Sequence, residues 1–237
     1  MPHNRFYYPN LDQQTISLKE NEFHHLAHVM KVKENEVVEV VDGRGSLVEA
    51  KVEKIERSQA LLKVLKKEQF KKLNYHLSVA IACPKFSHLE IALEKCTEIG
   101  ADEFILFESQ FSEKLYDSEA QKKRIENILI SAMKQCGRYY LPALKFIKDK
   151  NYFITLNNTK LLCSLTEETK KIKDLKLNSE SVTIIVGPEK GFSESDTNFF
   201  INEAKTIPVT LSPNILRMET ACIASTAQII QYLDQNF

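Results

Sequence analysis

A loop of small and charged residues follows an apolar run in the C-terminal third of the chain. The run IIV at residues 184–186 stops at Gly187, and the sequence GPEKGFSESD then occupies residues 187–196. Glycines beside charged residues after a buried strand are typical of loops that hold phosphate groups with backbone N–H donors. Ser193 and Asp196 have the spacing of a helix N-terminus, so we expect a helix to begin in this loop.

The loop does not match the established phosphate-binding motifs. Three residues separate Gly187 from Gly191, whereas the P-loop needs four, and Lys190 precedes the second glycine instead of following it. The dinucleotide motif also fails, because Pro188 follows Gly187 and no third glycine is present. Taken alone, the segment is equally compatible with a simple strand-to-helix connection that carries a helix cap.

A second loop, LSPNILRMETACIAS at residues 211–225, follows the next apolar segment. Ile215 and Leu216 are apolar at positions where a solvated loop is usually polar. Arg217 and Glu219 come just before a run of small residues, which allow a helix to approach another backbone closely. The pattern predicts an apolar wall and backbone donors around a flat ligand; the alternative is a buried turn that leads into a core helix.

The predicted elements that position these loops fall into two groups. Residues 1–72 contain short β-strand patterns, a DGRG hairpin turn and one amphipathic helix at 21–32. From residue 73 onward, apolar strands alternate with helices, which is typical of an α/β domain with a parallel sheet covered on both faces. We therefore expect domains at 1–72 and 73–237. Ligands bind at the carboxyl ends of such strands, so the loops after Leu165, Val186 and Leu211 are the informative ones.

Composition limits which classes of function and cellular location the chain can have. The chain has 32 basic and 32 acidic residues, so nucleic-acid binding would need a local patch. Its five cysteines are widely spaced without a C-x-x-C pair, which predicts reduced thiols in a cytoplasmic protein. We see no signal peptide and no apolar run of about 20 residues, so no membrane association is expected. His24 and His28 have metal-binding spacing but no third ligand, and no metal is expected.

The two loops together resemble the C-terminal signatures of the SPOUT-class RNA methyltransferases. The motifs GPEKGFSESD and LRMETACIAS are similar in particular to the family that methylates N3 of a uridine in 16S ribosomal RNA, the RsmE family. RFYY and HHLAHVMKVKENEVVEVVDGRG resemble its PUA-like domain, and KCTEIGADEF and SAMKQCGRYYLP resemble later segments. The similarity spans nearly all 237 residues. Two residues depart from the family pattern: Lys190 replaces a glycine and Lys31 replaces the more usual arginine.

The resemblance implies an α/β fold with a SPOUT-type parallel sheet and a C-terminal deep trefoil knot, preceded by a small PUA-like β-barrel domain that binds RNA. It implies S-adenosylmethionine as the cofactor, a homodimer, and 16S rRNA within the small ribosomal subunit as the substrate. The implied activity is methylation of uridine N3. The alternatives are 2′-O-ribose methylation by another SPOUT enzyme and a non-catalytic protein that binds RNA or assists ribosome assembly.

The resemblance also implies roles for individual residues. The expected catalytic residues are Arg217, Glu189 and Arg138. The expected cofactor-binding residues are Leu165, Gly187, Pro188, Glu189, Gly191, Leu211, Ser212, Ile215, Leu216, Arg217, Thr220 and Ala221. The expected RNA-binding residues are Arg5, His25, Lys31, Gln135 and Arg138.

Each catalytic assignment has a structural alternative. Arg217 could form a salt bridge with Glu219 or Glu189. Both glutamates are expected to order the loops through backbone N–H bonds in preference to acting as a base. Arg138 could stabilise the helix dipole.

Overall fold

The computed structural model describes residues 4–164, 169–177 and 180–234. The chain forms two compact units. The first contains Met1–Lys72 together with Ile130–Leu141, and the second contains Leu73–Leu129 together with Pro142–Phe237. Residues 130–141, which the sequence analysis placed in the second domain, therefore pack with the N-terminal unit.

The first unit is built on a five-stranded sheet in the order β1-β3-β4-β5-β2. All neighbouring pairs are antiparallel except β1 and β3, which run parallel. Apolar side chains that alternate along the strands form a closed core, which includes Phe6, Ile16, Leu26 and Val40. The strands are β1 (Arg5–Tyr7), β2 (Thr15–Lys19), β3 (Val37–Val41), β4 (Ser46–Ile55) and β5 (Gln59–Gln69). The β-rich first part that the sequence predicts is confirmed.

One helix accompanies this sheet. It starts as α1 (Glu20–His24) and continues as the π-helical turn η1 (His25–Val29). Phe23 and Leu26 are buried and join the core of the sheet. The second half of α3 (Glu119–Cys136) also belongs to this unit, where Met133 packs against Val41 and Leu47.

The second unit is a seven-stranded parallel sheet in the order β10-β12-β9-β11-β6-β7-β8. Its central strands are buried along almost their whole length, which explains their continuous apolar sequences. The strands are β6 (His76–Ala82), β7 (Glu103–Phe107), β8 (Ala143–Ile147), β9 (Thr159–Cys163), β10 (Lys170–Lys171), β11 (Ser181–Val186) and β12 (Ile207–Thr210). Two strands are not predicted from the sequence: β8, a half-exposed edge strand, and the two-residue β10.

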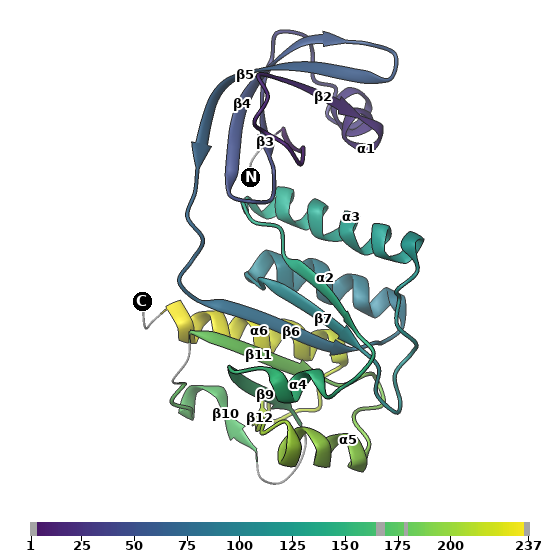
Figure 1. Ribbon diagram of the computed structural model, residues 1–237, viewed down its shortest axis with the longest axis vertical. Helices are drawn as coiled ribbons and strands as arrows, with labels where there is room; N and C mark the ends of the chain where they lie inside the picture. The colour runs from purple at the N-terminus through teal and green to yellow at the C-terminus, as the bar shows by residue number, and fades with distance from the viewer. Residues whose placement is uncertain (1–3, 165–168, 178–179, 235–237) are drawn as a thin grey trace. The chain divides into compact units, whose positions relative to one another are not determined.

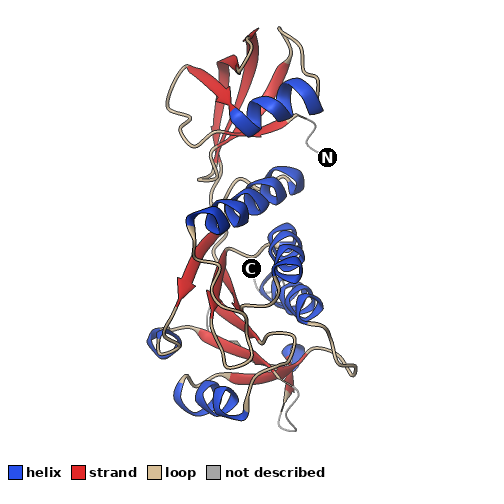
Figure 2. Ribbon diagram, turned by 90° about the vertical axis from the view of Figure 1, so that its right-hand side faces the viewer, coloured by secondary structure: helices blue, strands red, loops and turns tan. Residues whose placement is uncertain are grey.

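Helices cover both faces of this sheet, as predicted (Figure 1). On one face, α2 (Phe86–Ile99) packs against α6 (Met218–Asp234), and α6 also contacts β6 and β11. On the other face lie α4 (Tyr152–Thr155), α5 (Glu194–Asn198) and the π-helical turn η3 (Phe199–Glu203); η2 (Ile172–Asp174) is a short 3-10 turn. Figure 2 shows the two helical layers with the strands between them.

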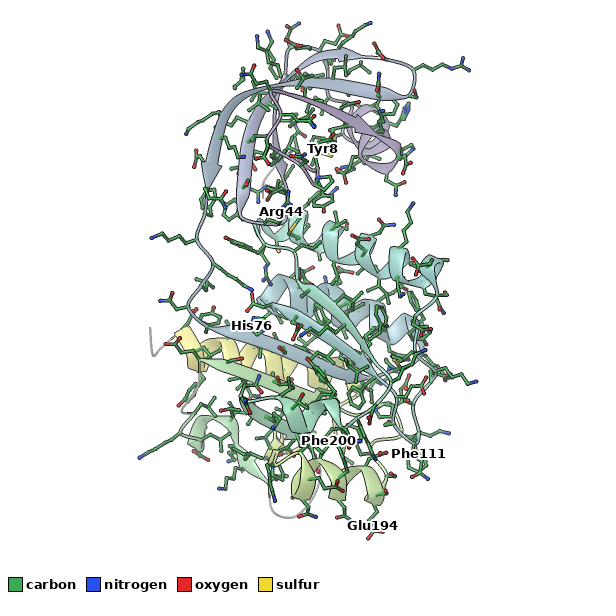
Figure 3. All side chains as sticks on the ribbon, in the orientation of Figure 1. Tyr8, Arg44, His76, Phe111, Glu194 and Phe200 are labelled. Carbon is green, nitrogen blue, oxygen red and sulfur yellow. The ribbon has the colours of Figure 1, made fainter. Side chains whose placement is uncertain are left out.

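A cluster of aromatic rings fills the second of these faces. Phe107, Phe153 and Phe200 meet with ring centroids 4.9–5.8 Å apart in edge-on geometry. Figure 3 labels Phe200 within this layer. The trefoil knot that the resemblance implies stays a prediction. Within the described residues, no helix has both the length and the apolar character needed to cross a membrane.

A charged network lies near the amino ends of the central strands, where Figure 3 labels His76. Glu103 accepts a hydrogen bond from the Ser78 hydroxyl at 2.9 Å and pairs with Lys145 at 2.7 Å. Burial alone would raise the pKa of Glu103, but the hydrogen bonds from His76, Lys145 and Ser78 outweigh it and lower the pKa to about 2.

Candidate functional site

The loops after three neighbouring strands enclose a cavity of about 520 Å³. Because β12, β9 and β11 are adjacent and parallel, their carboxyl ends meet at one edge of the sheet. Nine of the residues expected to bind a cofactor line this cavity: Gly187, Pro188, Glu189, Gly191, Leu211, Ser212, Ile215, Leu216 and Ala221. The two loops that stand out in the sequence therefore lie at one site.

Two expected residues do not contribute to the cavity wall. Arg217 and Thr220 are exposed neighbours of the lining residues Leu216 and Ala221. Leu165 lies outside the described residues. Other wall residues are not predicted from the sequence, among them Cys163, Ser164, Thr210, Phe192 and Met218. Cys163 and Thr210 are the last residues of β9 and β12, so the strand ends themselves were the signal for this part of the site.

The cavity loop contains a closed turn at residues 188–191. The Gly191 N–H donates to the Pro188 carbonyl at 2.8 Å. Gly191 has a φ of +73°, but neither Glu189 nor Lys190 has a positive φ. This is the pattern of a type I turn, which accepts most residues at its central positions and favours glycine at the last. Lys190 therefore replaces the expected glycine without backbone strain.

Gly187 is needed for a different reason. Its φ is not positive, yet a Cβ atom at this position would lie 3.2 Å from two ring carbons of Phe192. Phe192 is itself part of the cavity wall and packs against Phe200 at a centroid distance of 5.1 Å. Glycine at 187 thus allows the ring to close directly over the backbone at the end of β11.

A long-range hydrogen bond connects the cavity loop to the start of α2. One carboxylate oxygen of Glu189 accepts the backbone N–H of Lys85 at 2.9 Å. The neighbouring Pro84 carbonyl accepts the Tyr116 hydroxyl at 2.7 Å. Burial, together with the charges of Glu113, Cys83 and Glu189, raises the pKa of Tyr116 to about 12. Glu189 thus makes the backbone N–H bond that its structural role requires.

Arg217 and Glu219 do not pair with each other. Within the described residues, the side chain of Arg217 forms no hydrogen bond or ion pair, and the residue is exposed. Glu219 instead lies 3.2 Å from Nδ1 of His88 on α2. Since Glu189 is bonded to Lys85, the structural salt bridge considered for Arg217 is not formed with either glutamate.

The helix that leaves the cavity loop has the cap that its sequence predicts. Oγ of Ser193 accepts the backbone N–H of Asp196 at 3.1 Å. The buried Asp196 carboxylate receives the Ser193 hydroxyl at 2.9 Å, the Gln110 N–H at 3.1 Å and the Lys150 ammonium at 3.1 Å. Burial would raise the pKa of Asp196, but these hydrogen bonds lower it. The network fixes the far end of the cavity loop to the loop after β7.

The cavity wall also contains one thiol. Burial raises the pKa of Cys163 to about 12, so the group is a neutral, weakly nucleophilic thiol. No group of three histidine, cysteine or acidic side chains suited to a metal occurs in the part of the chain that the structure describes. His24 and His28 have ring centroids 5.1 Å apart.

The residues predicted to contact RNA belong to the first unit. Lys31 and Gln135 are exposed, and His25 is half-buried with its ring edge-on to Phe6. Burial, with a smaller effect of Lys134, lowers the pKa of His25.

Arg5 differs from these residues. Its side chain is 6% exposed, donates to Glu39 at 2.8 Å and lies over the Tyr139 ring at 5.3 Å. We therefore assign Arg5 a structural role in place of the predicted RNA contact, because its charge is already buried and paired.

Arg138 lies just beyond the end of α3. Its backbone N–H donates to the Met133 carbonyl at 3.1 Å, and the intervening Gly137 has a φ of +84°. This is a Schellman motif, in which a left-handed glycine closes the helix. The motif fixes the backbone from which the half-buried Arg138 side chain projects.

Fold and site together define an α/β protein that carries a ligand cavity at the carboxyl ends of its parallel strands, with a small β unit at its N-terminus. The family model for an RNA methyltransferase domain matches residues 71–230, and the model for an RNA methyltransferase PUA domain matches residues 18–65. The chain therefore belongs to this family of RNA methyltransferases. The resemblance seen in the motifs and the PUA-like character of the first unit are confirmed.

Individual relatives agree with this assignment. The chain is 29% identical to ribosomal RNA small subunit methyltransferase E of Buchnera aphidicola from Schizaphis graminum, covering 93% of this chain and 92% of the relative. The crystal structure of the Neisseria gonorrhoeae enzyme of that name, bound to S-adenosylmethionine, is 26% identical with a TM-score of 0.88 and 97% of each chain covered. A probable rRNA methyltransferase from Porphyromonas gingivalis is 28% identical with a TM-score of 0.85, covering 99% of this chain and 100% of that one.

Proposed function

We propose that the protein transfers the methyl group of S-adenosylmethionine to N3 of a uridine in the RNA of the small ribosomal subunit. The observation that carries the proposal is the cavity at the carboxyl ends of β9, β11 and β12 in a chain of the RNA methyltransferase family. Relatives named as small-subunit rRNA methyltransferase E, one of them crystallised with S-adenosylmethionine, support the choice of substrate and cofactor.

The lining of the cavity fits this cofactor. Leu211, Ile215 and Leu216 offer apolar surface for an adenine ring, and the turn at 188–191 offers backbone groups for its polar edge. The volume lies within the range that small-molecule sites usually have. Bound there, S-adenosylmethionine would supply an activated methyl group, so no metal and no covalent enzyme intermediate is required.

The residues of the chain would then have two tasks. They hold the acceptor nitrogen in line with the methyl group and stabilise the uridine anion once its N3 proton has passed to solvent water. Arg217 suits the second task, because it is exposed beside the wall residue Leu216 and pairs with no other side chain that the structure describes. Its guanidinium would bind the uracil carbonyls or an adjacent phosphate and lower the energy of the N3 anion. Glu189 would act structurally, because its carboxylate bonds to the backbone N–H of Lys85 and so fixes the position of the cavity loop.

The other features implied by the resemblance complete the proposal. Residues 1–72 would form the RNA-binding domain and residues 73–237 the knotted SPOUT domain. RNA contacts are proposed for His25, Lys31, Gln135 and Arg138. The protein would act as a cytoplasmic homodimer, with each active site near the subunit interface.

Two measurements test the proposal. Calorimetric titration with S-adenosylmethionine should show binding, and a methyl-transfer assay should compare naked 16S RNA with small subunits. Mass spectrometry of the product nucleoside should find the methyl group on N3 of uridine. A methyl group on a ribose 2′-oxygen would indicate the other SPOUT chemistry, and an absence of cofactor binding would indicate a non-catalytic RNA-binding protein.

A further inference from the structure

Two lysines lie on adjacent loops near the cavity, and neither is among the residues expected to bind the cofactor. Lys190 is an exposed residue of the turn at 188–191 and lines the cavity. Lys85 is exposed and precedes α2; its backbone N–H is bonded to Glu189, the residue next to Lys190. That hydrogen bond brings the two loops together although they are 104 residues apart in the chain.

The position of each lysine is set by its backbone. The hydrogen bond between Gly191 and Pro188 closes the turn that carries Lys190, and no positive φ strains it. Lys85 is fixed as the N-cap residue of α2 in extended geometry. Both ammonium groups therefore project from ordered backbone and retain only the freedom of their side chains.

Neither ammonium group is neutralised. Within the described residues, Lys85 and Lys190 form no ion pair and donate no side-chain hydrogen bond. Three acidic residues of this region have contacts of their own: Glu189 bonds to a backbone N–H, Asp196 pairs with Lys150, and Glu219 lies 3.2 Å from His88. The two ammonium groups therefore remain available to an external anion beside the cavity.

We propose that Lys190 and Lys85 form a phosphate-binding pair that holds the RNA backbone beside the target base. The inference rests on the proposed function, because it assumes that the cavity holds the cofactor and that RNA reaches it. Lysine binds phosphate as a point charge and needs little geometric precision, which suits two exposed side chains on separate loops. Lys190 would thus give this chain an RNA contact that a glycine at the same position cannot provide.

The competing ligand for Lys190 is the carboxylate of S-adenosylmethionine, since the residue also lines the cavity. Exposure favours RNA, because both lysines are accessible and Lys85 is not part of the wall. The two ligands predict different measurements. A phosphate contact changes the salt dependence of RNA binding, whereas a carboxylate contact changes the affinity for the cofactor.

The experiment compares Lys190→Gly, Lys85→Gln and a control, Lys205→Gly. Lys205 is exposed and unpaired within the described residues, and it precedes the amino end of β12, at the opposite edge of the sheet. Its φ of +56° suits glycine, so the control loses the same charge without strain. RNA affinity is measured for a 16S RNA fragment between about 0.05 and 0.4 M salt, and cofactor affinity is measured by calorimetry.

Each active-site variant should reduce the slope of log affinity against log salt by about 0.7 to 0.9, which corresponds to a loss of about five- to eightfold at 0.1 M salt. The control should keep the wild-type slope, and both the control and Lys85→Gln should keep the wild-type cofactor affinity. A wild-type slope for Lys190→Gly overturns the proposal, and a weakened cofactor affinity with that slope assigns Lys190 to the carboxylate. If the wild type binds no S-adenosylmethionine, the proposed function fails, while the comparison of slopes still decides whether these lysines contact RNA.

Discussion

The close contact between Gly187 and Phe192 leads to a quantitative prediction for Gly187→Ala. The added methyl group would lie 3.2 Å from two carbons of the Phe192 ring and 3.3 Å from its backbone nitrogen. The ring cannot retreat freely, because it packs against Phe200 at 5.1 Å and stacks on Phe107 at 6.4 Å. The backbone at Gly187 tolerates alanine, since its φ is not positive, so the effect is one of packing alone.

The size of the effect follows from overpacking. Inserting one methyl group into a well-packed region costs about 1–3 kcal/mol. If the ring stays in place, this cost lowers the free energy of unfolding. If the ring moves into the cavity, S-adenosylmethionine must push it back, and binding weakens by about 5- to 150-fold.

The assay measures both quantities on the same samples. Urea unfolding gives the stability of the ligand-free protein, and calorimetry gives the affinity for S-adenosylmethionine. Phe192→Leu supplies the control, because it removes the ring carbons that the new methyl group meets. The double variant should recover part of the loss, giving a coupling of about 1 kcal/mol or more. Wild-type stability and affinity for Gly187→Ala, or additive effects in the double variant, would refute the packing argument.

Three further predictions concern the loop, the chemistry and the sheet. Gly191→Ala should cost about 1–2 kcal/mol of unfolding free energy through its φ of +73° alone, because no atom of the described residues lies within 4 Å of the new Cβ. Urea unfolding checks this, and an unchanged midpoint would contradict it. Arg217→Ala should abolish methyl transfer while calorimetry still detects cofactor binding; unchanged turnover would remove Arg217 from the site. The lowered pKa of Glu103 means that its stabilising contribution is present above its unfolded pKa of about 4.5 and is lost as pH falls towards 2. Glu103→Gln should therefore lower stability at pH 7 by about 1–2 kcal/mol after allowance for solvent screening, and acid titrations of unfolding should show a smaller difference from the wild type near pH 2.

The sequence predicted the central architecture because its signals were local. Continuous apolar segments such as residues 182–186 have few alternatives to a buried parallel strand, and Ser193 with Asp196 forms the expected cap. The strand at 143–147 escaped prediction because it lies at the edge of the sheet, where its side chains are half-exposed and its sequence mixes polar with apolar residues.

The site could be predicted from the sequence only where its residues come directly after the carboxyl ends of predicted strands. Nine wall residues were anticipated from the two loops, yet Phe192 was not, since its role depends on the close approach of its ring to Gly187. The burial of Arg5 also could not be read from the sequence, because its partner Glu39 lies 34 residues away. Long-range pairing, including the bond between Glu189 and Lys85, leaves no pattern in a single sequence.

The strand order has a consequence for how the protein acquires its site. Strand β11 lies between β9 and β6, and it pairs Ile184 with Val79 from a much earlier part of the chain. Such non-local pairing slows folding, because a long loop must close before the contact forms. During synthesis, β6 and β7 leave the ribosome long before β11 and β12. Until β11 pairs with it, one side of β6 is an unpaired strand edge that can associate with other chains. The described residues that line the cavity all belong to the last third of the chain, so an RNA methyltransferase of this design becomes competent only when its own translation is nearly complete.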